Sequence, residues 1–307
     1  MSLIHMYMRI TVKLFFTLLL AVAVSVFGQS MSSASQEEAE YLAQLKMHAE
    51  SGNANAQYDL AWLYDTGDDS KILAKDVRKA AEWYEKAAIQ GHAKAQTGLG
   101  LLYVNGNGLP KDYVKGVDWL QKAAAQGDPE AQLHLGWLYR DNKGIPEDPA
   151  KALVWWQNAA DRGYAEAQFI LGVIYSNGEI VPRNIDKTIE YWEKAVMQGY
   201  PRAQLNLGSM YYFGKGVPKD VVRAAKLWQK AAAFGNADAQ YNLALAYYTG
   251  IGMQKDEFLS YVWSNLAVEY GGHESAKKLR DSIILTPEQR KTAGEMFANW
   301  QIGKVYQ

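Results

Sequence analysis

The most regular feature of this chain is an Ala-Gln pair that returns six times. The first two glutamines are 39 residues apart and the rest follow every 36 residues: Gln57, Gln96, Gln132, Gln168, Gln204 and Gln240. Counted from each Gln, Ala stands at −1, Leu at +3, Ala or Gly at +4 and Tyr at +7. These positions share one face of an α-helix. Each unit therefore predicts a first helix with one buried face, on which the small residue allows close packing.

A second helix is predicted later in every unit. An aromatic residue or Leu recurs in one register, followed by Ala four residues on and Gly after four more: Trp83, Trp119, Trp155, Tyr191, Leu227 and Trp263 begin these triplets. The constant register predicts that these large side chains belong to the core rather than to a ligand site. The glycines fit the left-handed C-cap position that ends a helix: Gly91, Gly127, Gly163, Gly199, Gly235 and Gly271.

The segments between the two helices are predicted turns, of which Gly106–Asp112 is one copy. Asn142 replaces the first Gly of its copy, and Asn also tolerates positive φ. The Gly-x-Gly pattern could suggest a phosphate loop, but no strand precedes it and it repeats at the period of the chain. Capping signals predict an opening helix before Gly52 and a closing helix that starts at Thr286-Pro287.

Together these motifs resemble the Sel1-like repeat family, a branch of the tetratricopeptide-like α-solenoids. The family motifs are present in Ala203–Tyr211, Gly214–Asp220 and Trp83–Gly91. The resemblance implies an all-α, right-handed α-solenoid of about six helix-turn-helix repeats of 36 residues, with N- and C-terminal capping helices. It places the solenoid at residues 36–285 and the C-terminal capping helix at 286–307. Members commonly serve as adaptors, so the resemblance implies protein or peptide partners.

The N-terminus is predicted to be a targeting segment. Arg9 and Lys13 precede an apolar run at Leu14–Phe27, which is short for a membrane span but suits a signal peptide. We expect a signal peptide at residues 1–28, with cleavage after Gly28 or Ala34, and a short linker at 29–35. The chain would then be periplasmic or secreted. The alternative is an N-terminal helix that is retained as an anchor.

Composition and motifs argue against several kinds of chemistry. The formal net charge of −1 disfavours a nucleic-acid binder, and the absence of Cys excludes thiolate chemistry. One branch of the family carries a disulfide in each repeat and has been linked to β-lactam binding, and this chain departs from that branch. Ser275-Ala276-Lys277-Lys278 matches S-x-x-K, but its partner motifs are missing. His92 and His273 are expected to face solvent near turns. We expect no catalytic residues, cofactor or metal.

The first helix leaves two positions outside its conserved face, at +2 and +5 from each Gln. Their identities change from repeat to repeat, and in tetratricopeptide-like solenoids the first helices line the concave surface. Aromatic residues and Arg are favoured at interface hot spots. The candidate partner-binding residues are Asp59, Trp62, His134, Trp137, the nearby Arg140, Ile170, Asn206, Ser209 and Asn242. The alternative is that the residues at +5 pack into the next repeat and only those at +2 are exposed. The chain is thus predicted to be a non-catalytic scaffold, with envelope glycan (peptidoglycan or exported polysaccharide) as the alternative ligand.

Overall fold

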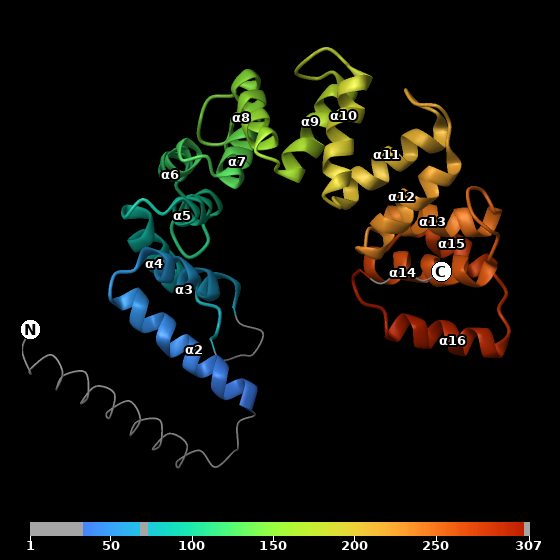
Figure 1. Ribbon diagram of the computed structural model, residues 1–307, viewed down its shortest axis with the longest axis horizontal. Helices are drawn as coiled ribbons and strands as arrows, with labels where there is room; N and C mark the ends of the chain where they lie inside the picture. Colours follow the sequence, from blue (N-terminus) through green and yellow to red (C-terminus); the bar gives the residue numbers. More distant parts are fainter. Residues whose placement is uncertain (1–32, 68–72, 304–307) are drawn as a thin grey trace, which may run out of the picture. The chain divides into compact units, whose positions relative to one another are not determined.

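A computed structural model describes residues 33–67 and 73–303, and these residues form fifteen α-helices (Figure 1). The opening helix is α2 (Ser33–Glu50), and the closing helices are α15 (Glu274–Ser282) and α16 (Pro287–Ala298). Between them the first helices are α3 (Ala54–Thr66), α5 (Ala93–Asn105), α7 (Pro129–Arg140), α9 (Ala165–Asn177), α11 (Pro201–Phe213) and α13 (Ala237–Thr249). The second helices are α4 (Val77–Ile89), α6 (Tyr113–Ala125), α8 (Pro149–Asp161), α10 (Ile185–Met197), α12 (Val221–Ala233) and α14 (Glu257–Gly271).

This arrangement confirms the predicted all-α repeats. First and second helices pack side by side in the pairs α3–α4, α7–α8, α9–α10, α11–α12 and α13–α14. The expected signal peptide lies outside the described residues, and Ala34 lies in the first turn of α2. The described residues fall into two compact units. The first contains α2 to α4 and most of α5, and the second contains the end of α5 and all later helices.

The conserved face of each first helix is buried, as predicted. The Leu at +3 is fully buried in all six repeats, and the Ala at −1 is nearly so. The glycine at +4 has a specific packing role in three repeats. A Cβ on Gly136 or Gly172 would overlap the indole of Trp156 or Trp192, and one on Gly208 would lie 2.8 Å from Trp228.

The three indoles are also held by hydrogen bonds. Nε1 of each Trp donates to the carbonyl oxygen three residues before the glycine, at 3.1–3.3 Å: Trp156 to Leu133, Trp192 to Phe169, and Trp228 to Leu205. The small residue is therefore required because the indole occupies the space that a side chain on the first helix would fill. We call each Gly–Trp pair an indole lock.

The prediction for the second-helix aromatic stripe is confirmed for Leu227 and Trp263, which are buried, and is wrong by one residue in the other four repeats. Trp83, Trp119 and Trp155 are only half-buried, while the residue that follows each one is buried in the core: Tyr84, Leu120 and Trp156. Lys86 and Lys122 lie over the half-buried rings, 3.7 and 4.2 Å from the ring centres of Trp83 and Trp119. Long lysine stems can cover apolar surface in this way while the ammonium stays in water. A periodic pattern alone does not distinguish two adjacent positions on a helix.

The turns behave largely as predicted. Asn142 adopts a positive φ of 51°, and the glycines at the ends of α4, α6, α8, α10 and α12 are left-handed. Gly271 is the exception, because α14 continues through it and Gly272 takes the left-handed C-cap. The Asp or Asn that ends each turn caps the second helix; Asp148, for example, accepts a hydrogen bond from the backbone N–H of Lys151 at 2.9 Å.

Two apolar clusters form much of the described core of the second unit. One runs from Leu133 to Trp228, and the other joins α12–α14 to residues of the closing segment that include Ile283, Leu285 and Ala293. The predicted start of the closing helix is confirmed, because Thr286 and Gln289 form a complete capping box and Pro287 opens the helix. The atypical final helices therefore cover apolar surface that a further repeat would otherwise bury.

Candidate functional site

The recurring glutamine is a buried structural residue. In five repeats its Nε2 donates at 3.0–3.2 Å to a carbonyl oxygen eight residues earlier, in the last turn of the preceding helix. Each of these carbonyl oxygens also accepts the backbone N–H of the glycine that follows the helix, at 2.9–3.1 Å. The glutamine therefore uses the second lone pair of the oxygen and ties the next first helix to this helix end. The sequence analysis found this glutamine by its spacing but assigned it no role.

The other amide atom, Oε1, needs a donor of its own. In the first repeat Gln90 Nε2 donates to Oε1 of Gln57 at 2.7 Å, and in the fourth Gln198 Nε2 donates to Oε1 of Gln168 at 2.8 Å. Both donors are the C-cap residue that follows a second helix. We call this donor position the amide slot.

The amide slot holds another residue type in three repeats. Arg162, Phe234 and Tyr270 take the place of Gln, and Oε1 of the matching Gln132, Gln204 or Gln240 is buried without a hydrogen-bond partner. Phe and Tyr offer no amide donor, and the Arg162 guanidinium lies elsewhere. A side chain on Gly127 would meet that guanidinium at 2.5 Å. The recurrence of Gln about 30 residues after the motif Gln was the sequence signal for this arrangement.

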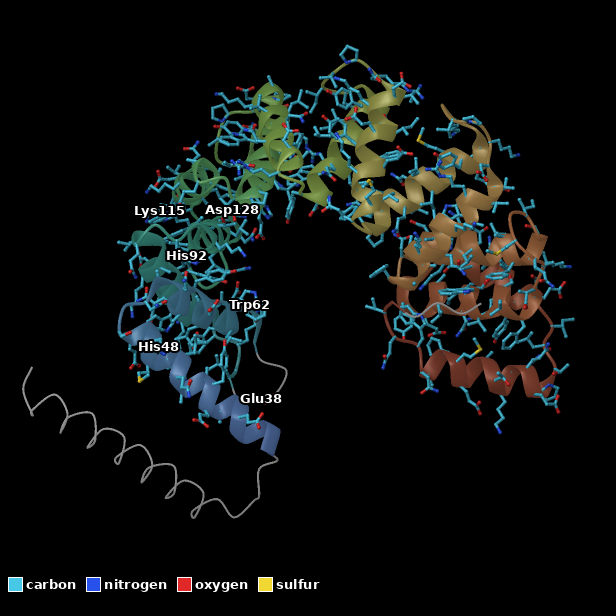
Figure 2. The ribbon with its side chains drawn as sticks, viewed as in Figure 1. Glu38, His48, Trp62, His92, Lys115 and Asp128 are labelled. Carbon is cyan, nitrogen blue, oxygen red and sulfur yellow. The ribbon has the colours of Figure 1, made fainter. Side chains whose placement is uncertain are left out.

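In the first unit, two candidate partner-binding residues lie on the solvent-exposed side of α3. Asp59 is exposed, and Trp62 projects from the helix with 50% of its surface exposed (Figure 2). A half-exposed Trp leaves a large apolar area in water, and covering that area favours association with another molecule.

In the second unit, α7 brings three of the candidates together. The Arg140 guanidinium lies 4.1 Å from the ring centre of Trp137. The Trp137 ring also packs edge-on against Trp156, with 5.0 Å between the two ring centres. Arg140 is exposed and donates to Asp141 Oδ1 at 2.7 Å, while Trp137 is half-buried. Burial raises the pKa of the Asp141 carboxyl. Hydrogen bonds from Arg140 and Lys143 lower this pKa by a larger amount, so the net shift is downward.

His134 completes this group on α7 and is half-buried. Burial lowers the pKa of its imidazole, and the Asp128 carboxylate offsets part of that shift. At neutral pH the side chain is therefore an uncharged polar group beside an aromatic–guanidinium stack.

The remaining candidates differ among themselves. Ile170 is 6% exposed and belongs to the apolar cluster against which Trp137 packs. Asn206, Ser209 and Asn242 are half-buried, and the Ser209 hydroxyl donates to the Leu205 carbonyl of its own helix at 3.0 Å. The candidates on α3 and α7 therefore differ from the others in combining at least partial exposure with aromatic or charged side chains.

The expectation that two histidines face solvent is wrong. His92 and His273 are N-caps whose Nδ1 accepts the backbone N–H of Ala95 or Ala276 at 3.1 Å. Each ring stacks on a tyrosine, at 4.7 Å from Tyr58 and 4.5 Å from Tyr241. Imidazole can accept this bond only when it is neutral.

Within the described residues, no group of three or more His, Asp or Glu side chains has the geometry of a metal site. No helix in residues 33–67 or 73–303 has the length and apolar character of a membrane span.

The repeated helix pairs define the class of this protein, which is an α-solenoid. Family comparison then gives the particular kind: the Sel1 repeat matches residues 54–92, 93–128, 129–164, 165–200, 201–236 and 237–270. The chain belongs to the Sel1 repeat family. The comparison with curated proteins finds no match.

Two solved structures are similar over most of the chain. A protective antigen present in uropathogenic Escherichia coli strains is 34% identical with a TM-score of 0.68; the match covers 84% of this chain and 56% of the antigen. A Sel1 repeat protein from Oxalobacter formigenes is 32% identical with a TM-score of 0.71, over 78% of this chain and 69% of that one. This chain thus spans little more than half the length of the antigen.

Proposed function

We propose that this protein is a non-catalytic scaffold that binds polypeptide partners through the first-helix residues outside the conserved face. The observation that carries the proposal is the exposure of Trp62 on α3, at a position whose equivalent varies from repeat to repeat. The core positions around it keep the same residue types, so the fold does not require a tryptophan there. Covering a half-exposed indole releases water from apolar surface and favours association.

The group on α7 supports the same interpretation for the second unit. Trp and Arg are enriched at interface hot spots, and the Arg140–Trp137 stack presents both as one preorganised surface. Preorganisation reduces the entropy that is lost when a partner binds. Ile170 is excluded from the proposed surface because its side chain is buried.

We further propose that the protein is exported to the bacterial envelope or secreted. The basic residues and short apolar run before Gly28 support this proposal, as does the similarity to an antigen of E. coli strains. N-terminal sequencing of the protein from a periplasmic or secreted fraction tests it. A mature N-terminus at Gln29 or Ser35 is the expected result, and an intact Met1 in the membrane fraction contradicts it.

The binding proposal can be tested by site-specific photo-crosslinking in an envelope extract. The crosslinker replaces Trp62 in one protein and Ile89, which is 71% exposed on the second helix α4, in the matched control. We expect a discrete crosslinked polypeptide from position 62 and none from position 89. In parallel, Trp62→Ala is expected to weaken capture of that polypeptide at least tenfold, while Ile89→Ala leaves it unchanged.

The α7 surface needs a milder variant because Trp137 also contributes to the core. Arg140→Ala removes the exposed guanidinium but keeps the indole contact with Trp156, and Lys143→Ala removes the other cation that contacts Asp141. We expect Arg140→Ala alone to weaken capture of the same polypeptide. Equal capture by the parent, Trp62→Ala and Arg140→Ala proteins would refute the proposed surface.

A further inference from the structure

The third repeat contains an open hollow next to its vacated amide slot. Its volume is about 460 Å³, and its walls come from the ends of α6 and α8 and from the start of α7. The lining residues are Ala124, Ala125, Gln132, Trp155, Asn158, Asp161 and Arg162. A volume of this size accommodates a few amino-acid residues.

The hollow contains one buried acceptor that has no partner. Gln132 is 3% exposed, and its Nε2 is already used by the Ala124 carbonyl at 3.2 Å, which fixes the orientation of the amide. Its Oε1 has no donor. A buried acceptor without a donor carries a desolvation penalty, so a group that supplies an N–H there gains more than an exposed hydrogen bond would give.

The chain itself shows which chemical group fits this position. In the fourth repeat the carboxamide of Gln198 occupies the equivalent place and donates to Gln168 Oε1, and in the first repeat Gln90 does the same for Gln57. Arg162 replaces that glutamine in the third repeat, and its guanidinium is displaced onto Gly127.

The other lining residues can bind the carbonyl oxygen of a carboxamide and the methylene groups that carry it. The Arg162 guanidinium and the Asn158 amide can both donate to a carbonyl oxygen, and the half-buried Trp155 ring offers an apolar surface for methylene groups. Asp161 already accepts from Gln157 Nε2 at 2.8 Å, and its charge opposes that of Arg162. The hollow therefore favours a neutral ligand that both donates and accepts.

We propose that this hollow binds the side-chain carboxamide of a Gln or Asn residue from a partner polypeptide. The partner's amide N–H donates to Gln132 Oε1, its carbonyl accepts from Arg162 as that exposed side chain changes rotamer, and its methylenes pack on Trp155. This inference rests on the proposed function for the class of its occupant, a polypeptide. It adds a contact site between the ends of α6 and α8 and the start of α7, separate from Trp62 and from Arg140.

The test is a titration of the ¹⁵N-labelled chain with short blocked peptides, followed by NMR. The peptides are Ac-Ala-Gln-Ala-NHMe and its Glu counterpart, and the methylamide ends avoid a second primary carboxamide. We expect the Gln peptide to shift the Trp155 indole signal and to bind at least tenfold more tightly than the Glu peptide, because a carboxylate cannot donate to Oε1.

Two matched variants locate the site. Arg162→Gln supplies the missing internal donor, as Gln198 does in the fourth repeat, and should reduce binding of the Gln peptide at least tenfold. Gln198→Arg vacates the slot beside Gln168 and should add a second binding site there, which raises the stoichiometry. Ile89→Ala on α4 should leave peptide binding unchanged.

Several results would overturn the inference. Equal binding of the Gln and Glu peptides, or unchanged binding by Arg162→Gln, would show that the hollow does not bind a side-chain carboxamide. Shifts of the Trp155 signal by N-acetylglucosamine or galacturonic acid but not by the Gln peptide would assign the hollow to a glycan instead. In each case crosslinking from position 62 would still report on the proposed function, so failure of one is distinguishable from failure of the other.

Discussion

The third and fourth repeats, residues 129–164 and 165–200, share a core and differ at their surface. Both contain an indole lock, Gly136 with Trp156 and Gly172 with Trp192, and in both the motif glutamine donates to the preceding helix at 3.2 Å. The fourth repeat fills its amide slot with Gln198, whereas the third leaves it open beside Arg162. At +2 the third repeat has a half-buried His134 where the fourth has a buried Ile170.

The comparison separates residues that hold the repeat from residues that distinguish one repeat from another. The indole lock and the glutamine bond satisfy backbone groups or fill close-packed space, so their replacement should have a similar effect in each repeat that contains them. The slot and the +2 position tolerate different chemistry because they lie at the margin of the core. A departure from the repeat pattern at these marginal positions is therefore the feature from which we infer binding.

The largest expected effect comes from the shared lock. Gly136→Leu and Gly172→Leu should each lower the free energy of unfolding by about 3 kcal/mol, since even a Cβ would overlap an indole. Urea denaturation followed by circular dichroism measures the change. Gly294→Ala in α16 is the control, because nothing lies within 4 Å of its added Cβ, and it should stabilise by about 0.5–1 kcal/mol. Similar losses at positions 136 and 294 would refute the lock.

Next in size is the difference between the two motif glutamines. Gln168→Leu leaves the Gln198 amide without its acceptor and removes one of the two hydrogen bonds to the Ala160 carbonyl, so it should destabilise by about 2 kcal/mol. Gln132→Leu removes one bond and one unpaired acceptor together, so it should cost about 1 kcal/mol. The same urea midpoints measure both variants. Equal losses would mean that the bond from Gln198 contributes nothing to stability.

How far the sequence predicts these features depends on what each residue contacts. Constant spacing predicts the helices, the turns and the positive φ at Asn142, because those depend on local conformation. The exchange of Trp155 for Trp156 as the core residue was not predictable from spacing, since two adjacent positions recur with the same 36-residue period. The caps formed by His92 and His273 were missed because imidazole replaces the usual Asn or Asp. Burial of Ile170 depends on the neighbouring repeat, which its own helix does not encode.

A smaller effect is expected when the slots of the two repeats are exchanged. Arg162→Gln should stabilise the chain by about 1 kcal/mol, because its amide supplies the donor that Gln132 Oε1 lacks. Gln198→Arg should destabilise it by a similar amount. Thermal unfolding of both single variants and of the double variant measures this exchange, and the double variant should lie close to the parent, since the two slots are independent. A loss of stability in Arg162→Gln would show that Arg162 is itself part of the packing.

The smallest effect concerns pH and the +2 position. Burial lowers the folded-state pKa of His134 below its unfolded value near 6.5, so the unfolded chain takes up this proton first as the pH falls. The contribution is therefore fully present above about pH 6.5 and declines as the pH falls towards the folded-state pKa. Urea midpoints at pH 7.5, 6.5 and 5.5 should fall more steeply for the parent than for His134→Gln. Ile170→His should add a comparable dependence in the fourth repeat, whose native residue does not titrate. Parallel midpoint curves for the parent and His134→Gln would show that this imidazole is as well hydrated in the folded chain as in the unfolded one, and the two repeats would then differ only in shape at this position.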